Sequence, residues 1–151
     1  MNTSNQKVIG RIELVNLPEW NFNDLEAKID TGAFTSSLHC HHLEPFEKEG
    51  ESWIRFYMLD PDHEAYNEQM LEMPVFDRRE VKSSNGEIEH RYFIQTKIEF
   101  FGSVSTIEFS LTDRSAMKYP LLIGRKFLRK GPFMVDVTSK NLSKNLKNKD
   151  S

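Results

Sequence analysis

The sequence contains a single cysteine, Cys40, among 151 residues, so no disulfide can form within the chain. A reducing compartment fits this shortage of cysteine. Long apolar runs are also missing: the polar first residues are not followed by a signal-type segment, and no stretch is long enough to cross a bilayer. These absences predict a cytoplasmic protein with no membrane partner.

Excess positive charge is absent as well. The formal net charge is −3 and the pI is about 6.0, whereas a general nucleic-acid-binding protein normally has a basic face. The chain has no glycine-rich loop that could cradle phosphates and no His-Glu-x-x-His motif. We therefore expect no nucleic-acid partner, no nucleotide or other cofactor, and no zincin mechanism.

The length is sufficient for one domain with a core of its own. We expect a flexible N-terminus over residues 1–7, a single domain over 8–140 and a disordered Lys- and Asn-rich tail over 141–151. Within the domain, about 45–77 has the character of an acidic insert, because Glu44 to Glu72 holds nine acidic and two basic residues.

Apolar residues follow strand periodicity along most of the chain and predict an all-β domain of about eight to ten strands. Asn85-Gly86 is a strong hairpin signal, and the hairpin-sized spacing predicts a closed or nearly closed barrel. Three other segments interrupt the strands: a charged loop over 45–52, a helical turn over 65–71 and a short helix over 125–130. Strands are expected over 8–17, 25–29, 34–43, 53–59, 74–82, 87–101, 104–112, 120–124 and 133–137.

Asp30-Thr31-Gly32 lies between the strands expected over 25–29 and 34–43. An Asp on a tight turn between buried strands is a carboxylate presented by a rigid scaffold, which suits acid/base chemistry. Ser36 and Ser37 follow and are interpreted as polar supports beneath the turn. The same three residues can also form a turn that merely links two strands, so the motif alone leaves both interpretations open.

Five ordered blocks carry a family resemblance. Together they resemble the retropepsins, the single-domain aspartic proteases of retroviral type, which implies a closed β-barrel with one or two short helices. The chain is most similar to a bacterial branch that is catalogued as ATP-dependent zinc proteases and associated with ATP-grasp ligases that add glutamate to proteins. The blocks are residues 28–33, 35–39, 79–86, 91–92 and 121–125.

The resemblance assigns roles to the Asp30 turn. It implies that Asp30 is the catalytic carboxylate, that the Thr31 hydroxyl ties two such turns together across a dimer, and that the Gly32 backbone faces substrate, with Ala33 beside it. Because one chain carries one Asp-Thr-Gly, a homodimer supplies the second carboxylate.

The remaining blocks imply a substrate cover and a support. Ser83, Ser84, Asn85 and Gly86 occupy the place of the flap, the hairpin that folds over bound peptide. Gly124 and Arg125 match the support of the active-site turn, where Arg opens the C-terminal helix. The expected partner is a peptide or protein substrate, with glutamate-modified proteins or an ATP-grasp ligase as candidates.

One departure concerns Arg125. Retroviral enzymes usually carry an acidic residue just after Asp-Thr-Gly-Ala that can pair with this Arg, but here the position is Phe34. Arg125 therefore needs another partner, which the sequence does not name.

Two alternatives remain. His39-Cys40-His41-His42 offers zinc ligands for a zinc-dependent hydrolase, but strand alternation places only His39 and His41 on one face, so structural histidines and no metal are expected. A non-catalytic module that holds a peptide or a ligase in a retropepsin-like cleft is the other alternative, because fold alone does not establish function.

Overall fold

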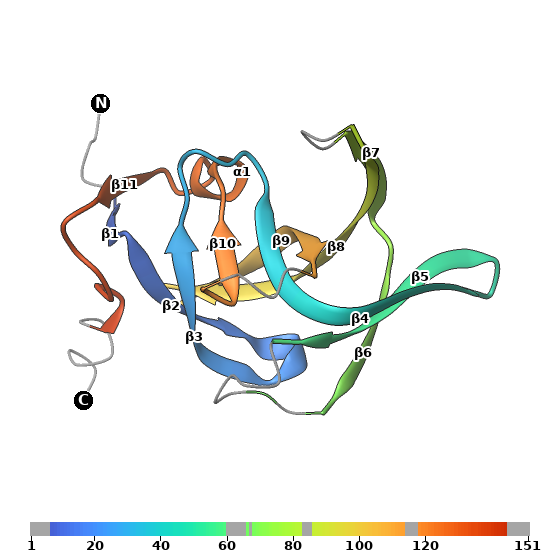
Figure 1. The fold of residues 1–151 in the computed structure, drawn as a ribbon. Helices are drawn as coiled ribbons and strands as arrows, with labels where there is room; N and C mark the ends of the chain where they lie inside the picture. Colours follow the sequence, from blue (N-terminus) through green and yellow to red (C-terminus); the bar gives the residue numbers. More distant parts are fainter. Residues whose placement is uncertain (1–6, 60–65, 67, 83–85, 114–117, 145–151) are drawn as a thin grey trace.

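The computed structural model describes residues 7–59, 66, 68–82, 86–113 and 118–144 (Figure 1). Strands make up most of the described chain, which confirms the all-β prediction. One 3₁₀ turn, η2 (Pro18–Trp20), and one short helix, α1 (Arg125–Leu128), accompany them. The strands are β1 (Lys7–Gly10), β2 (Ile12–Leu17), β3 (Phe22–Ile29), β4 (Ser36–Lys48), β5 (Glu51–Met58), β6 (Met70–Pro74), β7 (Asp77–Lys82), β8 (Ile88–Phe100), β9 (Ser103–Thr112), β10 (Leu121–Ile123) and β11 (Phe133–Asp136).

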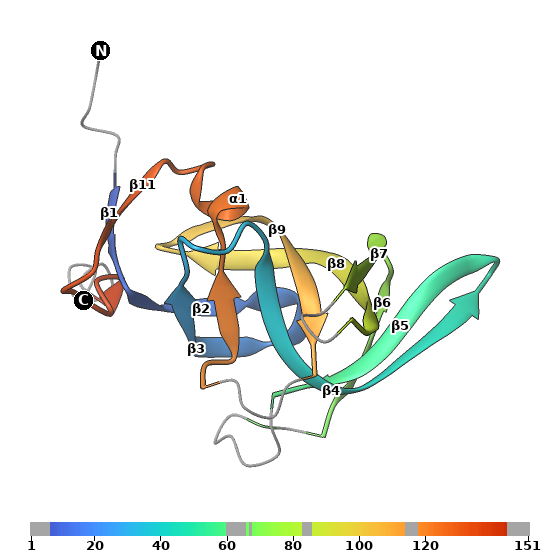
Figure 2. The ribbon, with the colours of Figure 1, turned by 45° about the horizontal axis from the view of Figure 1, so that its top comes forward.

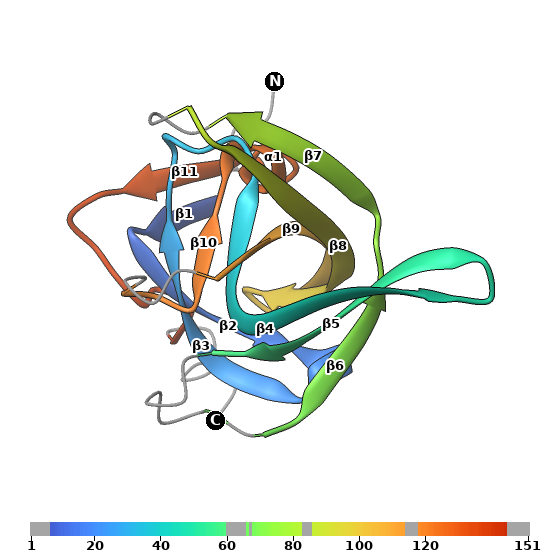
Figure 3. The same ribbon diagram turned by 45° about the vertical axis from the view of Figure 1, so that its right-hand side comes forward.

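The main sheet closes on itself as a ring (Figure 3). Its strands follow the order β10-β3-β2-β8-β9-β4, and β10 pairs again with β4 to complete the circuit. Inside the ring, alternate side chains of each strand form one apolar core, because every second residue of a strand points to the same face. Fully buried core residues include Val15, Leu25, Leu38, Ile94, Ile107, Phe109 and Leu121.

β5 and β6 lie outside the ring and extend the sheet beyond β4. The second half of β4 and the first half of β5 form a hairpin, the β4–β5 arm (residues 43–55), which projects from the body (Figure 2). β7 pairs only with β8, and β1 pairs in parallel with β11 in a separate two-stranded sheet. β7 ends at the same side of the ring as α1 (Figures 1 and 3).

The arm corrects the charged loop expected over 45–52. β4 continues to Lys48, and the turn is confined to Glu49 and Gly50, both of which have positive φ. Pro45 is compatible with this strand because β4 pairs only with β5 there, so the missing N–H breaks no second ladder. Aromatic packing of Phe46 on Trp53 then stabilises the exposed pair.

The helical turn expected over 65–71 is also wrong where the structure describes it. Met70 and Leu71 begin β6, and Leu71 pairs with Phe56 and is buried. Tertiary pairing with β5 therefore determines the conformation of this short segment. Within the described residues, no helix is long and apolar enough to cross a membrane.

The C-terminal segment contacts the beginning of the chain. The N–H of Asn141 donates to the carbonyl of Ile12 at 2.7 Å, and the buried Glu13 carboxylate accepts the N–H groups of Leu142 and Ser143. Contacts with the domain thus continue three residues beyond the boundary expected at residue 140.

Candidate functional site

The candidate site is built around the Asp30 turn, residues 30–35, which joins β3 to β4. The N–H of Asp30 donates to the carbonyl of Ile123 at 2.9 Å, so the end of β3 is held against β10. The Asp30 Oδ1 atom accepts the N–H of Gly32 at 3.0 Å. The half-buried carboxylate is therefore fixed by its own turn and by the neighbouring strand.

The first turn of α1 holds the other end of the Asp30 turn. The N–H of Arg125 donates to the carbonyl of Ala33 at 2.8 Å, and the N–H of Lys126 donates to the carbonyl of Phe34 at 2.9 Å. These are N–H groups that a helix leaves without intrahelical partners at its start. The N–H groups at the start of α1 are thus hydrogen-bonded to carbonyl groups of the turn that carries Asp30.

Gly124 allows this close approach. A Cβ atom at this position would lie 2.6 Å from the carbonyl oxygen of Thr35, which is nearer than real Cβ contacts. The Gly124 N–H donates to the buried hydroxyl of Ser36 at 3.0 Å. Ser36 is thus the polar support that the sequence predicted, whereas Ser37 lines a groove.

Arg125 finds the partner that the sequence did not name. Its Nη1 donates to the carbonyl of Thr31 at 2.9 Å, and its guanidinium carbon lies 5.9 Å from the centre of the Phe34 ring. Both Phe34 and the backbone of the turn thus take the place of a carboxylate, since an aromatic face attracts a cation. Phe34 remains 46% exposed, so this contact leaves much of its ring open.

The hairpin of β7 and β8 confirms the pairing that Asn85-Gly86 predicted. Its antiparallel register runs from Asp77 opposite Phe93 to Lys82 opposite Ile88. Of the four expected flap residues, Gly86 is exposed with a φ of +87°, while Ser83, Ser84 and Asn85 lie outside the described residues. The structure therefore describes the two strands that flank the expected flap.

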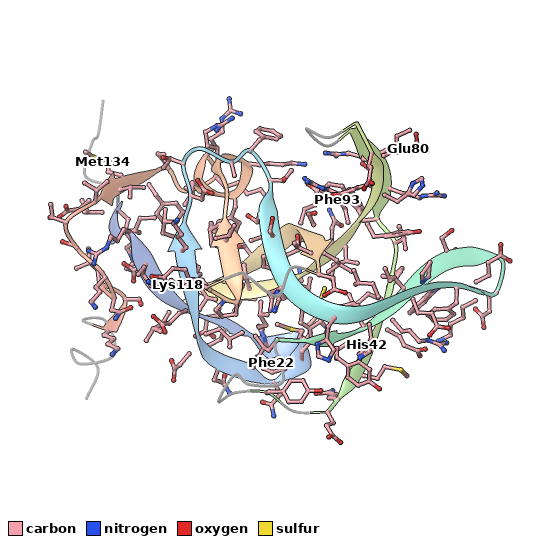
Figure 4. All side chains as sticks on the ribbon, viewed as in Figure 1. Phe22, His42, Glu80, Phe93, Lys118 and Met134 are labelled. Carbon is pink, nitrogen blue, oxygen red and sulfur yellow. The ribbon has the colours of Figure 1, made fainter. Side chains whose placement is uncertain are left out.

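One face of this hairpin is directed toward the Asp30 turn. Figure 4 shows Phe93 on this side and Glu80 on the outer side. Arg79 packs its guanidinium 4.4 Å from the Phe93 ring centre and donates from Nε to Asp77 at 2.8 Å. That hydrogen bond is the main reason why the pKa of Asp77 lies below its usual range. Arg91 is directly opposite Arg79 in the register.

Two open grooves flank these elements. One of about 770 Å³ is bordered by Thr31 and Phe34 of the turn together with α1 and β11. The other, of about 470 Å³, is bordered by Ser37, Leu122 and residues of β8 that include Arg91. The first groove is bordered by residues of the Asp30 turn itself, whereas the second lies along β4, β10 and the start of β8.

The histidine cluster does not form a ligand set with the groups that the structure describes. His39 and Cys40 are buried, and burial raises the pKa of the Cys40 thiol, which disfavours the thiolate that binds zinc. The His41 Nδ1 lies 2.8 Å from the carbonyl of Leu59, and its ring stacks on Tyr57. Among the described residues, no group of three or more His, Cys, Asp or Glu side chains could hold a metal ion.

Glu108 is a buried charged residue near the site that was not identified from the sequence. Glu108 of β9 has a side chain only 6% exposed, and its Oε2 accepts a hydrogen bond from Lys126 Nζ at 2.6 Å. Its position among alternating polar residues of the strand gave no signal of burial, because the polar face of a strand looks the same whether water or another element covers it.

The closed all-β ring and the Asp-Thr-Gly turn supported by Gly124 and Arg125 define a retropepsin-like protein. The chain belongs to the RimB-like family, described as retropepsin-like aspartic endopeptidase RimB, whose family model matches residues 8–145. The resemblance inferred from the five sequence blocks is confirmed.

Similar curated proteins are named as ligases, whereas the family model describes an endopeptidase. The chain is 38% identical over 128 residues to a probable alpha-L-glutamate ligase from Shewanella halifaxensis, and 33% identical over 121 residues to one from Desulfotalea psychrophila. These matches cover 82% and 80% of this chain but only 27% and 26% of those proteins. The chain thus spans about a quarter of the length of the curated relatives it matches.

A solved structure has the same fold over nearly the whole chain. It is the crystal structure of protein Lpg0085 from Legionella pneumophila, described as having unknown function, with a TM-score of 0.75 and 28% sequence identity. The match covers 91% of this chain and 98% of the Legionella chain.

Proposed function

We propose that this chain is an aspartic endopeptidase whose active site forms when two copies bring their Asp30 side chains together. The observation that carries the proposal is the construction of the Asp30 turn, which β10 holds at one end and the start of α1 at the other. A turn that merely linked two strands would not need its carbonyl groups bound by a separate helix. Membership of the RimB-like family supports the same chemistry.

The dimer would supply what one chain lacks. Two carboxyl groups brought within hydrogen-bonding distance cannot both ionise without strong repulsion, so the pair shares one proton. The ionised Asp30 accepts a proton from a bound water, whose oxygen attacks the scissile carbonyl, while the protonated Asp30 donates a hydrogen bond to the carbonyl oxygen. The leaving nitrogen then takes a proton from the dyad as the C–N bond breaks.

In this scheme Thr31 joins the two turns, and the backbone of Gly32 and Ala33 binds the peptide. The hairpin tip, Ser83 to Gly86, covers the substrate and excludes water, which strengthens the interactions around the dyad. Gly124 and Arg125 keep the turn in place. The proposal requires no metal and no cofactor.

Glutamate-modified proteins are the substrates that we propose. The support is twofold: similar proteins are named glutamate ligases, and Arg79 and Arg91 lie opposite each other on one face of the hairpin. Each arginine also has an acidic neighbour on its own strand, Asp77 for Arg79 and Glu89 for Arg91. A substrate carboxylate would thus bind as a further anion between two guanidinium groups that repel each other. We propose that a glutamate ligase is a binding partner of this protein.

The test compares the wild-type chain with Asp30→Asn on peptides that end in several glutamates and on an unbiased peptide library. We expect cleavage of the glutamate-rich peptides by the wild type and a loss of turnover of at least about a thousandfold in the variant, because the dyad then has no general base. Circular dichroism and sedimentation would show that the variant keeps its fold and its assembly.

The opposite outcome would favour a binding module. Specific binding of glutamate-rich peptides without cleavage, at equal affinity in the wild type and in Asp30→Asn, would overturn the endopeptidase proposal. Cleavage that persists in the variant would show that another group performs the chemistry.

A further inference from the structure

Glu108 occupies an unusual place between three elements of the candidate site. It belongs to β9, whereas Lys126 belongs to α1 and Arg79 to β7. Glu108 Oε2 lies 2.6 Å from Lys126 Nζ, and Oε1 lies 3.9 Å from Arg79 Nη2. One buried carboxylate is thus shared by two cations that come from opposite sides of the site.

The two contacts differ in kind. The contact with Lys126 is a short, charge-assisted hydrogen bond, which is among the stronger polar interactions in proteins. The contact with Arg79 is longer than a hydrogen bond, and no hydrogen-bond partner is recorded for Oε1 within the described structure. A buried oxygen without a hydrogen bond is costly, so a shorter contact with Arg79 would lower the free energy.

On the turn side, Lys126 is connected to the turn that carries Asp30 by a backbone hydrogen bond. Lys126 holds the carbonyl of Phe34 with its own N–H, and its side chain is anchored on Glu108. A cavity of about 60 Å³ beside Glu108 and Lys126 is also bordered by Thr35 and Ser36. Lys126 therefore links Glu108 to the Asp30 turn, with its side chain on the carboxylate and its N–H on the carbonyl of Phe34.

The cation on the hairpin side is fixed to its own strand. Arg79 is bound to Asp77 and packs on Phe93, so it moves with β7 and β8. Its side chain is 46% exposed, which leaves room for displacement. Movement of the hairpin relative to the turn would therefore change the distance from Arg79 to Glu108, the charged contact that joins β7 to β9 in the described structure.

We propose that Glu108 is a positioning residue, whose carboxylate couples the β7–β8 hairpin to the Asp30 turn through Arg79 on one side and Lys126 on the other. As the hairpin descends, Arg79 completes the hydrogen bonding of Oε1 and stabilises Lys126 and the turn. The proposal rests on the proposed function, since it assigns the hairpin and the turn to one active site.

Hydrogen–deuterium exchange of the full chain tests the coupling without any need for catalysis. Arg79→Gln substitutes a residue of the hairpin that has no hydrogen bond or ion pair to residues 30–36 within the described structure, yet we expect faster amide exchange there, by at least about threefold, because coupled contacts change the free energy of local opening. Lys126→Met should likewise accelerate exchange in 77–82 and 88–93. In a Glu108→Gln background, Arg79→Gln should add no further change in the turn.

Lys97→Met is the matched control. Lys97 also donates a hydrogen bond to a β9 residue, Thr106, which lies two residues from Glu108, so exchange in residues 30–36 should stay at the wild-type rate if the coupling runs through Glu108. Unchanged exchange of the turn in Arg79→Gln would overturn the coupling, as would additive effects of Arg79→Gln and Glu108→Gln. Arg79→Gln alters a partly exposed side chain, so this test does not depend on the folding of the Glu108 variant.

Steady-state kinetics separate this proposal from the proposed function. If the wild type cleaves peptide, Glu108→Gln should raise KM by about tenfold with a smaller change in kcat, because the hairpin closes less firmly over substrate, and Arg79→Gln should raise KM at least as much because Arg79 is also proposed to bind the substrate carboxylate. An unchanged KM in both variants would contradict the role of Glu108 in hairpin closure. If the wild type cleaves nothing, the proposed function fails, and the exchange measurements still decide whether the coupling exists.

Discussion

At the scale of single residues, the Asp30 turn depends on small side chains at fixed places. Gly124 leaves space for the carbonyl of Thr35, and Ser36 accepts the N–H of Gly124 inside the protein. The backbone directly after β10 is thus in close contact with the end of the turn, and the Ser36 hydroxyl forms a hydrogen bond between them.

Ser36→Ala tests this arrangement. The substitution leaves the buried N–H of Gly124 without its acceptor, which costs about 1–3 kcal/mol of unfolding free energy. Urea denaturation would measure the loss. Ser37→Ala is the matched control, since Ser37 faces a groove and its substitution should change the unfolding free energy by less than about 0.5 kcal/mol. Equal effects of the two substitutions would show that the Ser36 hydroxyl is not a specific support.

The residue scale also shows what the sequence could predict. Asp30, Gly124 and Arg125 were singled out because each belongs to a short motif that resembles the family pattern. The pairing of Arg125 with Phe34 was not found, because an aromatic partner for a guanidinium carries no charge signal in the sequence. Glu108 was missed for a related reason, since the contacts that bury it come from β7 and α1, both distant along the chain.

At the scale of elements, the local patterns were reliable where a strand alternates or is wholly apolar, as β10 is. β3, β9 and β10 agree with their predicted ranges to within about three residues, as did the hairpin strands. The β4–β5 arm was misinterpreted, because Pro45 and a run of charges are typical of loops, and only pairing with β5 makes a strand favourable there. The arm is stabilised by contacts across the hairpin, such as Lys48 over the ring of Trp53.

A second element-scale feature is the attachment of the C-terminal segment to β1 and β2 by Glu13. Its carboxylate is fully buried and accepts three backbone N–H groups, from Gly10, Leu142 and Ser143, at 2.7, 3.1 and 2.9 Å. A carboxylate suits this place because it offers acceptors only, whereas an amide would turn donor hydrogens toward one of the N–H groups.

Glu13→Gln should therefore destabilise the protein by about 1.5–3 kcal/mol, the usual contribution of hydrogen bonds to a charged group. Thermal unfolding would measure the change, and limited proteolysis should cut the C-terminal segment first. Glu26→Gln is the control, because Glu26 is an exposed residue of the adjoining β3. Wild-type resistance of the segment in Glu13→Gln would show that other contacts hold it.

At the scale of the whole molecule, the single Asp-Thr-Gly of each chain sets the strongest requirement of the proposed function. One chain contributes one Asp30, and a dyad must contain one from each of two chains related by a twofold axis. The groove beside Thr31 and Phe34 leaves this side of the turn open to a second copy. A monomeric enzyme would need a second carboxylate from elsewhere in its own chain.

A mixing experiment distinguishes these two cases. If subunits exchange at random between equal amounts of wild type and Asp30→Asn, about a quarter of the dimers keep both carboxylates, and half of the wild-type chains are lost to mixed dimers. Peptide-cleaving activity should fall to about half of that given by the same amount of wild type alone. A further excess of the variant should reduce it more, in proportion to the remaining fraction of wild-type chains.

The mixing result separates inhibition by dimer formation from simple dilution. An equal amount of the double variant Asp30→Asn/Thr31→Ala should inhibit less, because the Thr31 hydroxyl is proposed to join the two turns and its loss weakens the mixed dimer. Activity unchanged by any excess of Asp30→Asn would mean that each chain works alone, and the Asp30 dyad would then be wrong. The stoichiometry of inhibition thus tests the whole-molecule requirement directly, since only an active site shared between two chains is lost when one partner lacks its carboxylate.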